Sequence, residues 1–471
     1  MKRKFYLAKV VLSICTLGLI VTSCEQEQMN ETLDANSMQL EEAPPFKNYM
    51  VITADSEMTK SVENYLKTSD GEIVNSIPEI GISIVSSKDA NFIQNTLKNK
   101  NVTSVVPDYD IAWIPTSEGV EAHLPEATPS IGSTEPYYYY DYLWGLEAID
   151  APQAWNAGFT GEGASVFVLD SGIDAEHIEL APNLNTDLCA SFVPGEHWNI
   201  LTTTPFDNHG THVAGTIAAA QNDKGLIGVA PNVELVAVKV LSEFTGSGAF
   251  SSINAGIVYA ANNGADVINM SLGVTLNKNG TLIDADGNSF RIPAKYIQEV
   301  IIAQQRAIDY AFKKGTTIIA SAGNDYTNYD GNTSLIKLPG GLNNVITVSA
   351  TAPEGYDWTA EYTNFDVPAS YTTYGRSLVD VAAPGGDVDV ALHDMILSTG
   401  NNNSLYWSAG TSMAAPHVSG VAALIIAKNG GQMDPQSVAK QLSKTADKID
   451  GNGQSAYFGK GRVNAFRAVT E

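Results

Sequence analysis

The amino-acid sequence predicts an α/β protein, in which a doubly wound, mostly parallel sheet with helices on both faces follows a small α+β domain. Three observations support this fold class. Beyond residue 141, short apolar runs alternate with helical stretches, as buried parallel strands and their crossover helices do. Residues 46–114 carry a shorter alternation of strand and helix patterns. The chain of 471 residues, 44% of them hydrophobic, is long enough to fold into both units.

The composition excludes several classes of protein. The chain contains 27 Lys and Arg against 52 Asp and Glu, which gives a net charge of −25. Nucleic-acid binding needs a basic surface, and docking on anionic lipid needs a basic cluster, so we expect neither. Three cysteines in so long a chain also exclude a disulfide scaffold. Cys189 is expected to be a small buried apolar residue rather than a reactive thiol.

The N-terminus has the pattern of an export signal, with basic residues before an apolar stretch over residues 10–21. The run VTSC, ending at Cys24, resembles the bacterial lipobox, in which the signal is cut before a lipid-carrying cysteine. We expect residues 1–23 to be removed and Cys24 to anchor the exported chain to the cell envelope, at the outer membrane or surface. Residues 24–45 would form a flexible acidic tether. The alternative is an ordinary signal peptide followed by an incidental cysteine.

Residues 46–114 are expected to form a small α+β domain with the order βαββαβ. This order suits a four-stranded antiparallel sheet with two helices on one face. The clearest strand patterns and helical spacings lie at residues 49–53, 58–66, 80–84, 90–97 and 102–106. Residues 115–140 contain prolines and serines without a sustained pattern, and we expect an exposed linker that is open to proteolysis.

The domain predicted over residues 141–471 carries polar residues where a ligand would bind. Its apolar runs lie at residues 165–169, 235–240, 267–270, 317–320 and 345–349. Ligands of such sheets bind at the carboxyl ends of the strands, and Asp170 directly follows the first run. A carboxylate there must be hydrogen-bonded, metal-bound or catalytic. His209 and Ser412 each lie near the start of an expected helix.

An aspartate, a histidine and a serine in these positions suggest nucleophilic catalysis. A serine hydroxyl is a poor nucleophile unless a histidine takes its proton and an acid orients that histidine. Alone, Asp170 or Ser412 could be a helix cap and His209 a satisfied core histidine. Together they favour a catalytic triad. His212 and His417, in the same motifs, are interpreted as structural residues and not as second bases.

The motifs VLDSGID, NHGTHVAGTIAA, SAGN and GTSMAAPHVSG resemble the signatures of the subtilisin-like serine proteases, and the resemblance covers most of the chain beyond residue 144. It implies a subtilisin-like fold and endopeptidase activity. It also implies that Ser412 attacks the scissile carbonyl, that His209 is the general base and then the acid, and that Asp170 stabilises the imidazolium. The Asn324 amide and the Ser412 backbone N–H would bind the oxyanion.

The resemblance further implies where a protein or peptide substrate binds. The substrate would add as an extended strand between two segments of this chain. These are Ser271-Leu272-Gly273 and, facing it, Gly246-Ser247-Gly248. Phe250 would border the pocket for the fourth residue before the cut and favour an apolar side chain there.

Residues 274–299 form an apparent insertion beside the primary specificity pocket, which could narrow the specificity or bind a partner. Its Asp284, Asp286 and Asn288 suggest calcium binding, but they do not have the spacing of an EF-hand loop, so we interpret them as an acidic turn.

No cofactor is expected for the chemistry, but the resemblance suggests a structural calcium ion in the loop at residues 220–226. Asn222 matches a side-chain ligand position, and Glu179 replaces the usual aspartate. Carbonyl and carboxylate oxygens suit this hard cation. The family's N-terminal glutamine ligand has no counterpart here, because Tyr140 lies near its place.

The resemblance gives residues 46–114 the role of a propeptide that assists folding and then inhibits the enzyme intramolecularly. Cleavage within residues 115–140 would follow. Because Cys24 lies on the propeptide side of that cut, maturation would release the catalytic domain from the membrane.

The predicted function is therefore that of an exported lipoprotein zymogen of a serine endopeptidase. One alternative keeps this chemistry but restricts it to a single partner protein through the 274–299 insertion. Another is a non-catalytic surface binding protein on the same scaffold. The presence of Asp170, His209, Ser412 and Asn324 together disfavours that alternative, since a protein that only binds does not need all four.

Overall fold

A computed structural model describes residues 48–54, 58–114, 119–122, 142–201, 208–222, 225–283, 289–354, 364–388, 391–451 and 453–471. These residues belong to one compact unit. The expectations for residues 1–45, including the lipid anchor at Cys24, lie outside the described residues, as do most of the expected linker, Tyr140 and the acidic turn at 284–288.

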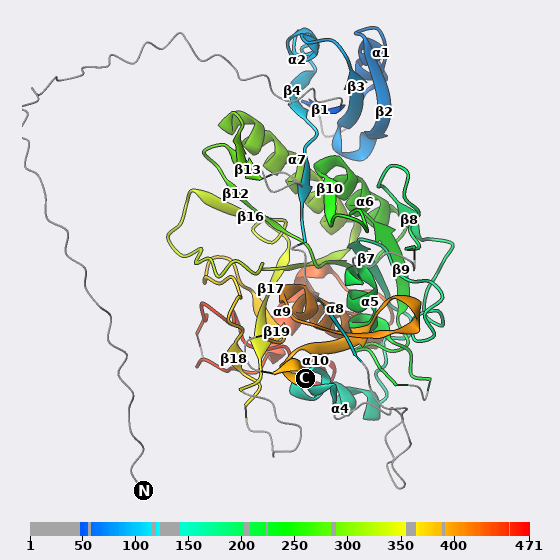
Figure 1. Cartoon of the computed structure of the whole chain (residues 1–471), viewed down its shortest axis with the longest axis vertical. Helices are drawn as coiled ribbons and strands as arrows, with labels where there is room; N and C mark the ends of the chain where they lie inside the picture. Colours follow the sequence, from blue (N-terminus) through cyan, green and yellow to red (C-terminus); the bar gives the residue numbers. More distant parts are fainter. Residues whose placement is uncertain are drawn as a thin grey trace, which may run out of the picture. The chain divides into compact units, whose positions relative to one another are not determined.

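A mostly parallel sheet forms the centre of this unit (Figure 1). Its strands follow the order β18-β17-β15-β11-β7-β9-β8, and β19 lies beside β17. The strand bounds are β7 Ser165–Asp170, β8 Ala190–Ser191, β9 Glu234–Lys239, β11 Val267–Met270, β15 Thr317–Ser321, β17 Ile346–Ala352, β18 Val367–Pro368 and β19 Val381–Pro384. Only the β17–β18 pairing is antiparallel in the part of the sheet that is described. The prediction of a doubly wound α/β fold is confirmed.

Helices cover both faces of this sheet, because its strands are apolar on both sides. In β7, Val166 and Val168 face one hydrophobic core, whereas Phe167 and Leu169 face the other. The first core contains α3 Trp144–Ala148, α4 Ala151–Asn156, α5 His209–Ala218, α8 Thr411–Lys428, α9 Pro435–Thr445 and α10 Ala465–Thr470. The second contains α6 Phe250–Asn262 and α7 Ala294–Lys314. Helix α8 is buried from Thr411 to Ile426, which explains why its sequence is apolar on every side.

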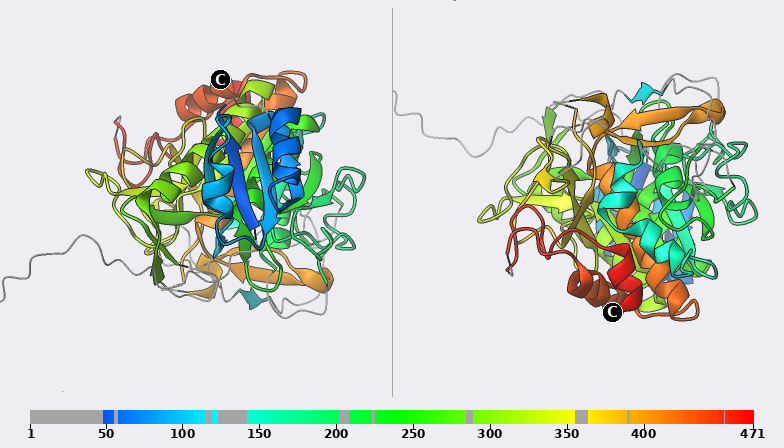
Figure 2. Two further views of the ribbon diagram at one scale, coloured as in Figure 1. Left: turned by 90° about the horizontal axis from the view of Figure 1, so that it is seen from above. Right: turned by 90° about the horizontal axis from the view of Figure 1, so that it is seen from below.

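The N-terminal unit has the order βαββαβ and a sheet of order β2-β3-β1-β4 with antiparallel pairings. Its elements are β1 Asn48–Thr53, α1 Lys60–Lys67, β2 Gly71–Ile77, β3 Ile82–Ser87, α2 Phe92–Thr96 and β4 Val102–Pro107. One face of the sheet packs on α1 and α2 in a small core of its own. Residues of the other face, such as Ile52 and Ile84, belong to the same core as α6 and α7. Figure 2 shows this unit, in blue, over the green helices.

The predicted insertion builds a second small sheet. Its strands, β12 Val274–Asn277, β13 Thr281–Ile283 and β14 Ser289–Arg291, join β16 Leu335–Leu338 in the order β14-β13-β12-β16. Residues 294–299, which were assigned to the insertion, form the first turns of α7. The insertion is therefore a three-stranded addition to β16.

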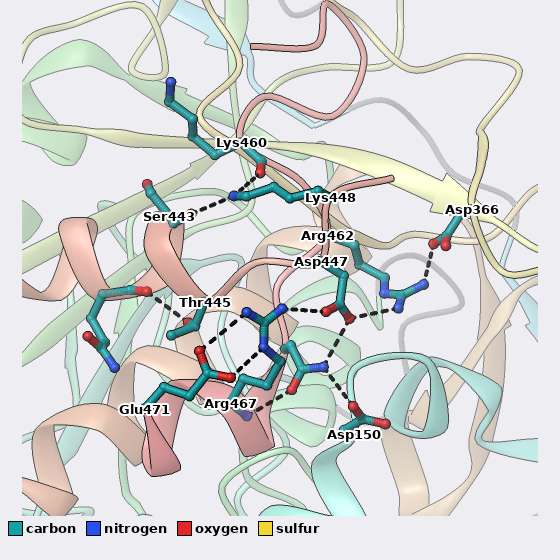
Figure 3. A network of polar contacts seen from close by, with 12 residues as sticks. Asp150, Asp366, Ser443, Thr445, Asp447, Lys448, Lys460, Arg462, Arg467 and Glu471 are labelled. Atoms are coloured by element: carbon teal, nitrogen blue, oxygen red, sulfur yellow. Dashed lines mark hydrogen bonds and ion pairs between the residues drawn. The ribbon is translucent and has the colours of Figure 1, made fainter. Parts of the chain in front are cut away.

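Hydrogen bonds and ion pairs connect the C-terminal segment to the rest of the catalytic domain (Figure 3). Asp447 accepts hydrogen bonds from Arg462 (3.0 Å), from Arg467 (2.9 Å) and from the side-chain amide of Asn464 (2.9 Å). The same amide donates to Asp150 (2.6 Å), directly before α4. Asn464, which directly precedes α10, thus connects that helix to Asp150 before α4. The Asp447 carboxylate accepts charge-assisted hydrogen bonds from both arginines.

A further sequence-based expectation concerns cysteine chemistry. Cys189 is half-buried, and burial raises the pKa of its thiol to about 11, as expected for a packing residue rather than a nucleophile. Among the described residues, no helix combines the length and the apolar character needed to cross a membrane.

His212 and His417 are buried structural residues, as the sequence predicts. The Nε2 atom of His212 lies 3.0 Å from the carbonyl oxygens of both Ile396 and Tyr406, and His417 Nδ1 lies 2.8 Å from that of Met413. Carbonyl oxygens only accept, so these ring nitrogens carry the protons. Burial lowers the pKa of each imidazole to about 4, and both histidines are neutral at ordinary pH.

These two histidines predict an acid-sensitive fold. In the unfolded chain their pKa returns to about 6.5. Between pH 6.5 and pH 4 the unfolded state therefore binds more protons than the folded state. The free energy of unfolding should fall as the pH falls through this window, by roughly 3 kcal/mol per histidine at most.

Urea unfolding across this range should show a shallower pH dependence of the free energy of unfolding for His417→Gln than for the wild type. Ser443→Ala provides the control, because it removes no titratable side chain and should leave the slope unchanged. Equal slopes for all three chains would contradict the assignment.

Candidate active site

The structure brings Asp170 and His209 into direct contact. Asp170 ends strand β7, and His209 is the first residue of α5. The His209 Nδ1 atom lies 2.9 Å from Asp170 Oδ1 and 3.1 Å from Oδ2, and both side chains are buried. A carboxylate only accepts hydrogen bonds, so Nδ1 carries the proton and Nε2 has the lone pair of a base. The backbone N–H of Ser171 donates to Asp170 Oδ1 (2.7 Å) and helps to fix the carboxylate.

Ser412 is the second residue of α8, and two reciprocal hydrogen bonds hold it against Ser271. Its hydroxyl donates to the Ser271 carbonyl (3.1 Å), and the Ser271 hydroxyl donates to the Ser412 carbonyl (2.8 Å). The second bond has a local cause. Pro416 has no N–H, so the Ser412 carbonyl lacks the helical donor four residues on, and Ser271 supplies a donor instead.

Asn269 extends this contact into the core. Its side-chain amide donates to Ser271 Oγ (3.0 Å), and its Oδ1 accepts from Ser419 of α8 (2.8 Å). Asn269 is fully buried on β11, and each of these contacts satisfies a buried polar atom. The network fixes the start of α8 against β11. The sequence analysis missed Asn269, although an asparagine inside the apolar run VINM was a visible signal.

Asn324 follows β15 and is clamped by Thr411. Its Oδ1 accepts from the Thr411 backbone N–H (3.0 Å) and hydroxyl (2.7 Å). These two donors fix the amide so that Nδ2 is directed away from them. A Cβ atom added at Gly410 would lie 3.1 Å from Asn324 Nδ2 and 3.6 Å from the Ser412 backbone nitrogen. The two predicted oxyanion donors therefore border one space, which the glycine at 410 leaves open.

Residues 110–113 lie between the two predicted substrate-binding segments and form hydrogen bonds to both. Strand β5 (Asp110–Ala112) pairs antiparallel with β10 (Ser247–Ala249). The next residue, Trp113, donates from its backbone to the Gly246 carbonyl (3.1 Å) and accepts from the Gly273 N–H (2.9 Å). An extended segment thus lies between the segments at 246–248 and 271–273, as expected for a bound peptide strand.

The Trp113 side chain contacts Phe250, the residue predicted to border an apolar pocket. The ring centroids lie 4.9 Å apart at an interplanar angle of 73°, an edge-to-face contact. Both rings are buried, and the indole N–H donates to the Gly248 carbonyl (2.8 Å). Leu272, from the facing segment, is buried as well. The region around Phe250 can therefore hold a large apolar side chain.

A second stretch that follows the N-terminal unit pairs with the strand before Ser412. Strand β6 (Val120–Glu121) pairs antiparallel with β21 (Leu405–Ser408), which also pairs with β20 (Ile396–Thr399). Strand β21 ends four residues before Ser412, whose hydroxyl contacts Ser271. Residues 110–113 and 120–121 are therefore both paired with segments that adjoin the residues around Ser412.

The predicted calcium ligands lie on neighbouring segments. The Ala220 N–H donates to the Glu179 carbonyl (2.8 Å), and the Asn222 amide donates to the Ile178 carbonyl (3.3 Å). The Glu179 side chain is buried. Within the ranges that the structure describes, no cluster of three or more His, Cys, Asp and Glu side chains is arranged for a metal ion. Residues 223–224 of the loop lie outside those ranges. Calcium remains a prediction.

Comparisons with known proteins agree with this geometry. Residues 161–461 match the sequence model of the subtilase family, peptidase S8. Thermitase from Thermoactinomyces vulgaris is 35% identical over 335 residues, which cover 70% of this chain and 97% of thermitase. Subtilisin E from Bacillus subtilis is 35% identical over 385 residues, which cover 81% of each chain.

Two solved structures have the same fold. The epidermin leader peptide processing serine protease from Staphylococcus aureus superposes with a TM-score of 0.68 at 24% identity and covers 90% of this chain and 97% of that one. Fervidolysin from Fervidobacterium pennivorans, a keratinolytic enzyme related to subtilisin, gives a TM-score of 0.63 at 25% identity and covers 90% and 61%. The prediction of a subtilisin-like serine peptidase is thereby confirmed, and this chain belongs to the subtilase family.

Proposed function

We propose that this serine endopeptidase cleaves proteins through Asp170, His209 and Ser412 and is made as a self-inhibited zymogen. The observation that carries the catalytic assignment is the contact of His209 Nδ1 with Asp170, because it leaves Nε2 as the basic nitrogen. A surface binding protein would not need a histidine whose basic nitrogen is fixed by a buried carboxylate. We therefore set that alternative aside.

The proposed reaction has two steps. Ser412 Oγ turns from Ser271 toward His209, gives its proton to Nε2 and attacks the substrate carbonyl carbon. The negative charge that develops on the carbonyl oxygen is bound by Asn324 Nδ2 and the Ser412 N–H. The imidazolium then gives its proton to the leaving amine as the C–N bond breaks. Water repeats the sequence on the acyl-enzyme, and Asp170 stabilises the cationic imidazole each time.

The N-terminal unit supports the zymogen proposal through its contacts with the catalytic domain. Asp108 accepts from the backbone N–H (3.2 Å) and hydroxyl (2.5 Å) of Ser251, so its carboxylate lies at the N-terminus of α6. Arg306 of α7 donates to the carbonyls of Thr53 (3.1 Å) and Ile80 (3.3 Å). These contacts support a unit that directs residues 110–113 onto the substrate-binding segments, where they would exclude other peptides.

The pairings on either side narrow the proposed maturation site. Trp113 is hydrogen-bonded to Gly246 and Gly273, and Val120 and Glu121 pair with β21. We infer that the first cut falls between these two paired stretches, at the start of the broader region 115–140 that the sequence suggests.

A protease restricted to one partner is a second candidate. The observation that favours it is the three-stranded addition to β16, which places extra structure next to Gly273. The chemistry would be unchanged, and only the range of substrates would differ.

Self-processing is the first test of the proposed function. Purified from residue 25 onward, the wild-type chain should split between Trp113 and Val120, as measured by intact mass, and Ser412→Ala should stay whole. A fluorophosphonate should label the wild type at Ser412. Ser443→Ala, a half-buried serine away from the site, should behave as the wild type. Absence of both splitting and labelling in the wild type would refute the proposal.

Asn324 should affect turnover rather than binding. Asn324→Ala should lower kcat by about 10²–10³ with little change in KM, a cost known from removal of one oxyanion donor in subtilisin. Thr411→Val keeps the backbone N–H that holds Asn324 and removes only the hydroxyl bond, so we expect a smaller loss of about tenfold. The measurement is steady-state cleavage of a chromogenic peptide by both variants. Retention of wild-type kcat by Asn324→Ala would exclude the assigned role.

Maturation should also change where the protein is found. We propose that Cys24 carries a lipid, and the cut then separates this anchor from the catalytic domain. In a bacterial host, Ser412→Ala should remain in the washed membrane fraction, whereas the processed wild-type domain should appear in the soluble fraction. Cys24→Ser should leave both chains unanchored. Processed catalytic domain that stays on washed membranes would contradict the release.

A further inference from the structure

Lys337 is a buried lysine beside the reaction centre with no role in the chemistry described above. It lies on β16 opposite Thr275 of β12, and only 4% of its surface is exposed. A Cβ atom added at Gly273 would lie 3.0 Å from Lys337 Cε, and one added at Gly323 would overlap the ammonium group. The ammonium therefore occupies the space between the substrate-binding segment and the segment that carries Asn324.

The charge of Lys337 is only partly compensated. Within the described part of the chain, its Nζ atom has no hydrogen bond and no carboxylate oxygen within 4.0 Å. Burial lowers the pKa of its ammonium, and the negative charge of Asp325 acts in the opposite direction. Burying a cation without a close partner is unfavourable. A ligand that brings a carboxylate to this position would relieve that cost.

Asp325 is the carboxylate whose charge acts on the Lys337 ammonium, but both of its oxygens already accept hydrogen bonds from other residues. Its Oδ2 accepts from the Thr275 hydroxyl (3.0 Å), and its Oδ1 accepts from the Thr373 hydroxyl. Burial raises the pKa of Asp325, but Lys337 and these two hydroxyls outweigh it and hold the pKa below its usual value. Asp325 is therefore an anion fixed to the pocket wall, and Lys337 keeps donors for a second anion.

A substrate side chain can reach this space. The residue before the scissile bond has its carbonyl at Asn324, and the strand that contains it runs along residues 271–273. In the proposed function its side chain would then project between Gly273 and Gly323, two positions without side chains of their own. Lys337 enters the same space from β16.

We propose that Lys337 forms the floor of the primary specificity pocket and selects glutamate, and less strongly aspartate, as the residue before the cut. This inference rests on the proposed protease function and concerns its substrate class. The ammonium would donate to the substrate carboxylate, while the insertion strand β12 and Asp325 form the wall of the pocket. The opposite expectation is that Lys337 only fills the pocket and leaves room for alanine or glycine.

The test compares peptides that differ only in the residue before the cut, with tryptophan fixed at the fourth position. Chain purified from residue 25 and allowed to mature would be assayed with glutamate, glutamine, aspartate, leucine and alanine at that residue. We expect kcat/KM for glutamate to exceed that for glutamine on the order of tenfold to a hundredfold, the range for a hydrogen bond to a charged group. Lys337→Met should abolish or invert this ratio while retaining cleavage after leucine.

Matched variants distinguish the effect of the Lys337 charge on specificity from the effect of its size and shape. Lys337→Arg should keep a preference for an acidic residue, and Asp325→Asn should increase it because a competing anion is lost. A wild-type preference for alanine or leucine, unchanged by Lys337→Met, would overturn the inference while leaving the protease function intact. Failure to cleave any peptide, together with absent fluorophosphonate labelling, would instead refute the proposed function itself. Cleavage after leucine by Lys337→Met shows that this variant folds.

Discussion

The site depends on how the first turn of α8 is held against the carboxyl end of β11. Pro416 deprives the Ser412 carbonyl of its helical donor, and Ser271 replaces that donor. Buried Asn269 then ties Ser271 to the same helix. Since Thr411 in that turn also orients Asn324, one short stretch of backbone sets the positions of both the serine and the amide. A preorganised site of this kind needs little rearrangement when charge develops.

The N-terminal unit and the catalytic domain share one hydrophobic core. Met50, Ile52 and Val106 of its sheet belong to the same buried cluster as residues of α6 and α7. Covering these helices removes their apolar surface from water. Asp108 of the N-terminal unit also places its carboxylate where α6 begins and exposes N–H groups. These contacts support the proposal that the unit assists folding.

Much of this could be predicted from sequence because the signals are local. The apolar runs identified the central strands, and four motifs indicated Asp170, His209, Asn324 and Ser412 as candidate site residues. Lys337 could not be predicted, because a lysine in the run LIKL has the pattern of a half-exposed strand. Its burial results from pairing with β12, which lies some sixty residues earlier in the chain. The clamp on Asn324 likewise joins residues 87 positions apart.

Strands β5 and β6 are unequal, and this difference would give the proposed cut a direction. Newly formed ends held side by side can rejoin, because the amine remains next to the acyl group at high effective concentration. Strand β6 has two residues, both exposed, whereas the β5 side adds the buried Trp113 and a whole folded unit behind it. The short strand should therefore fray first. Loss of the amine end would make the cut irreversible, while the carboxyl end stays on the enzyme that produced it.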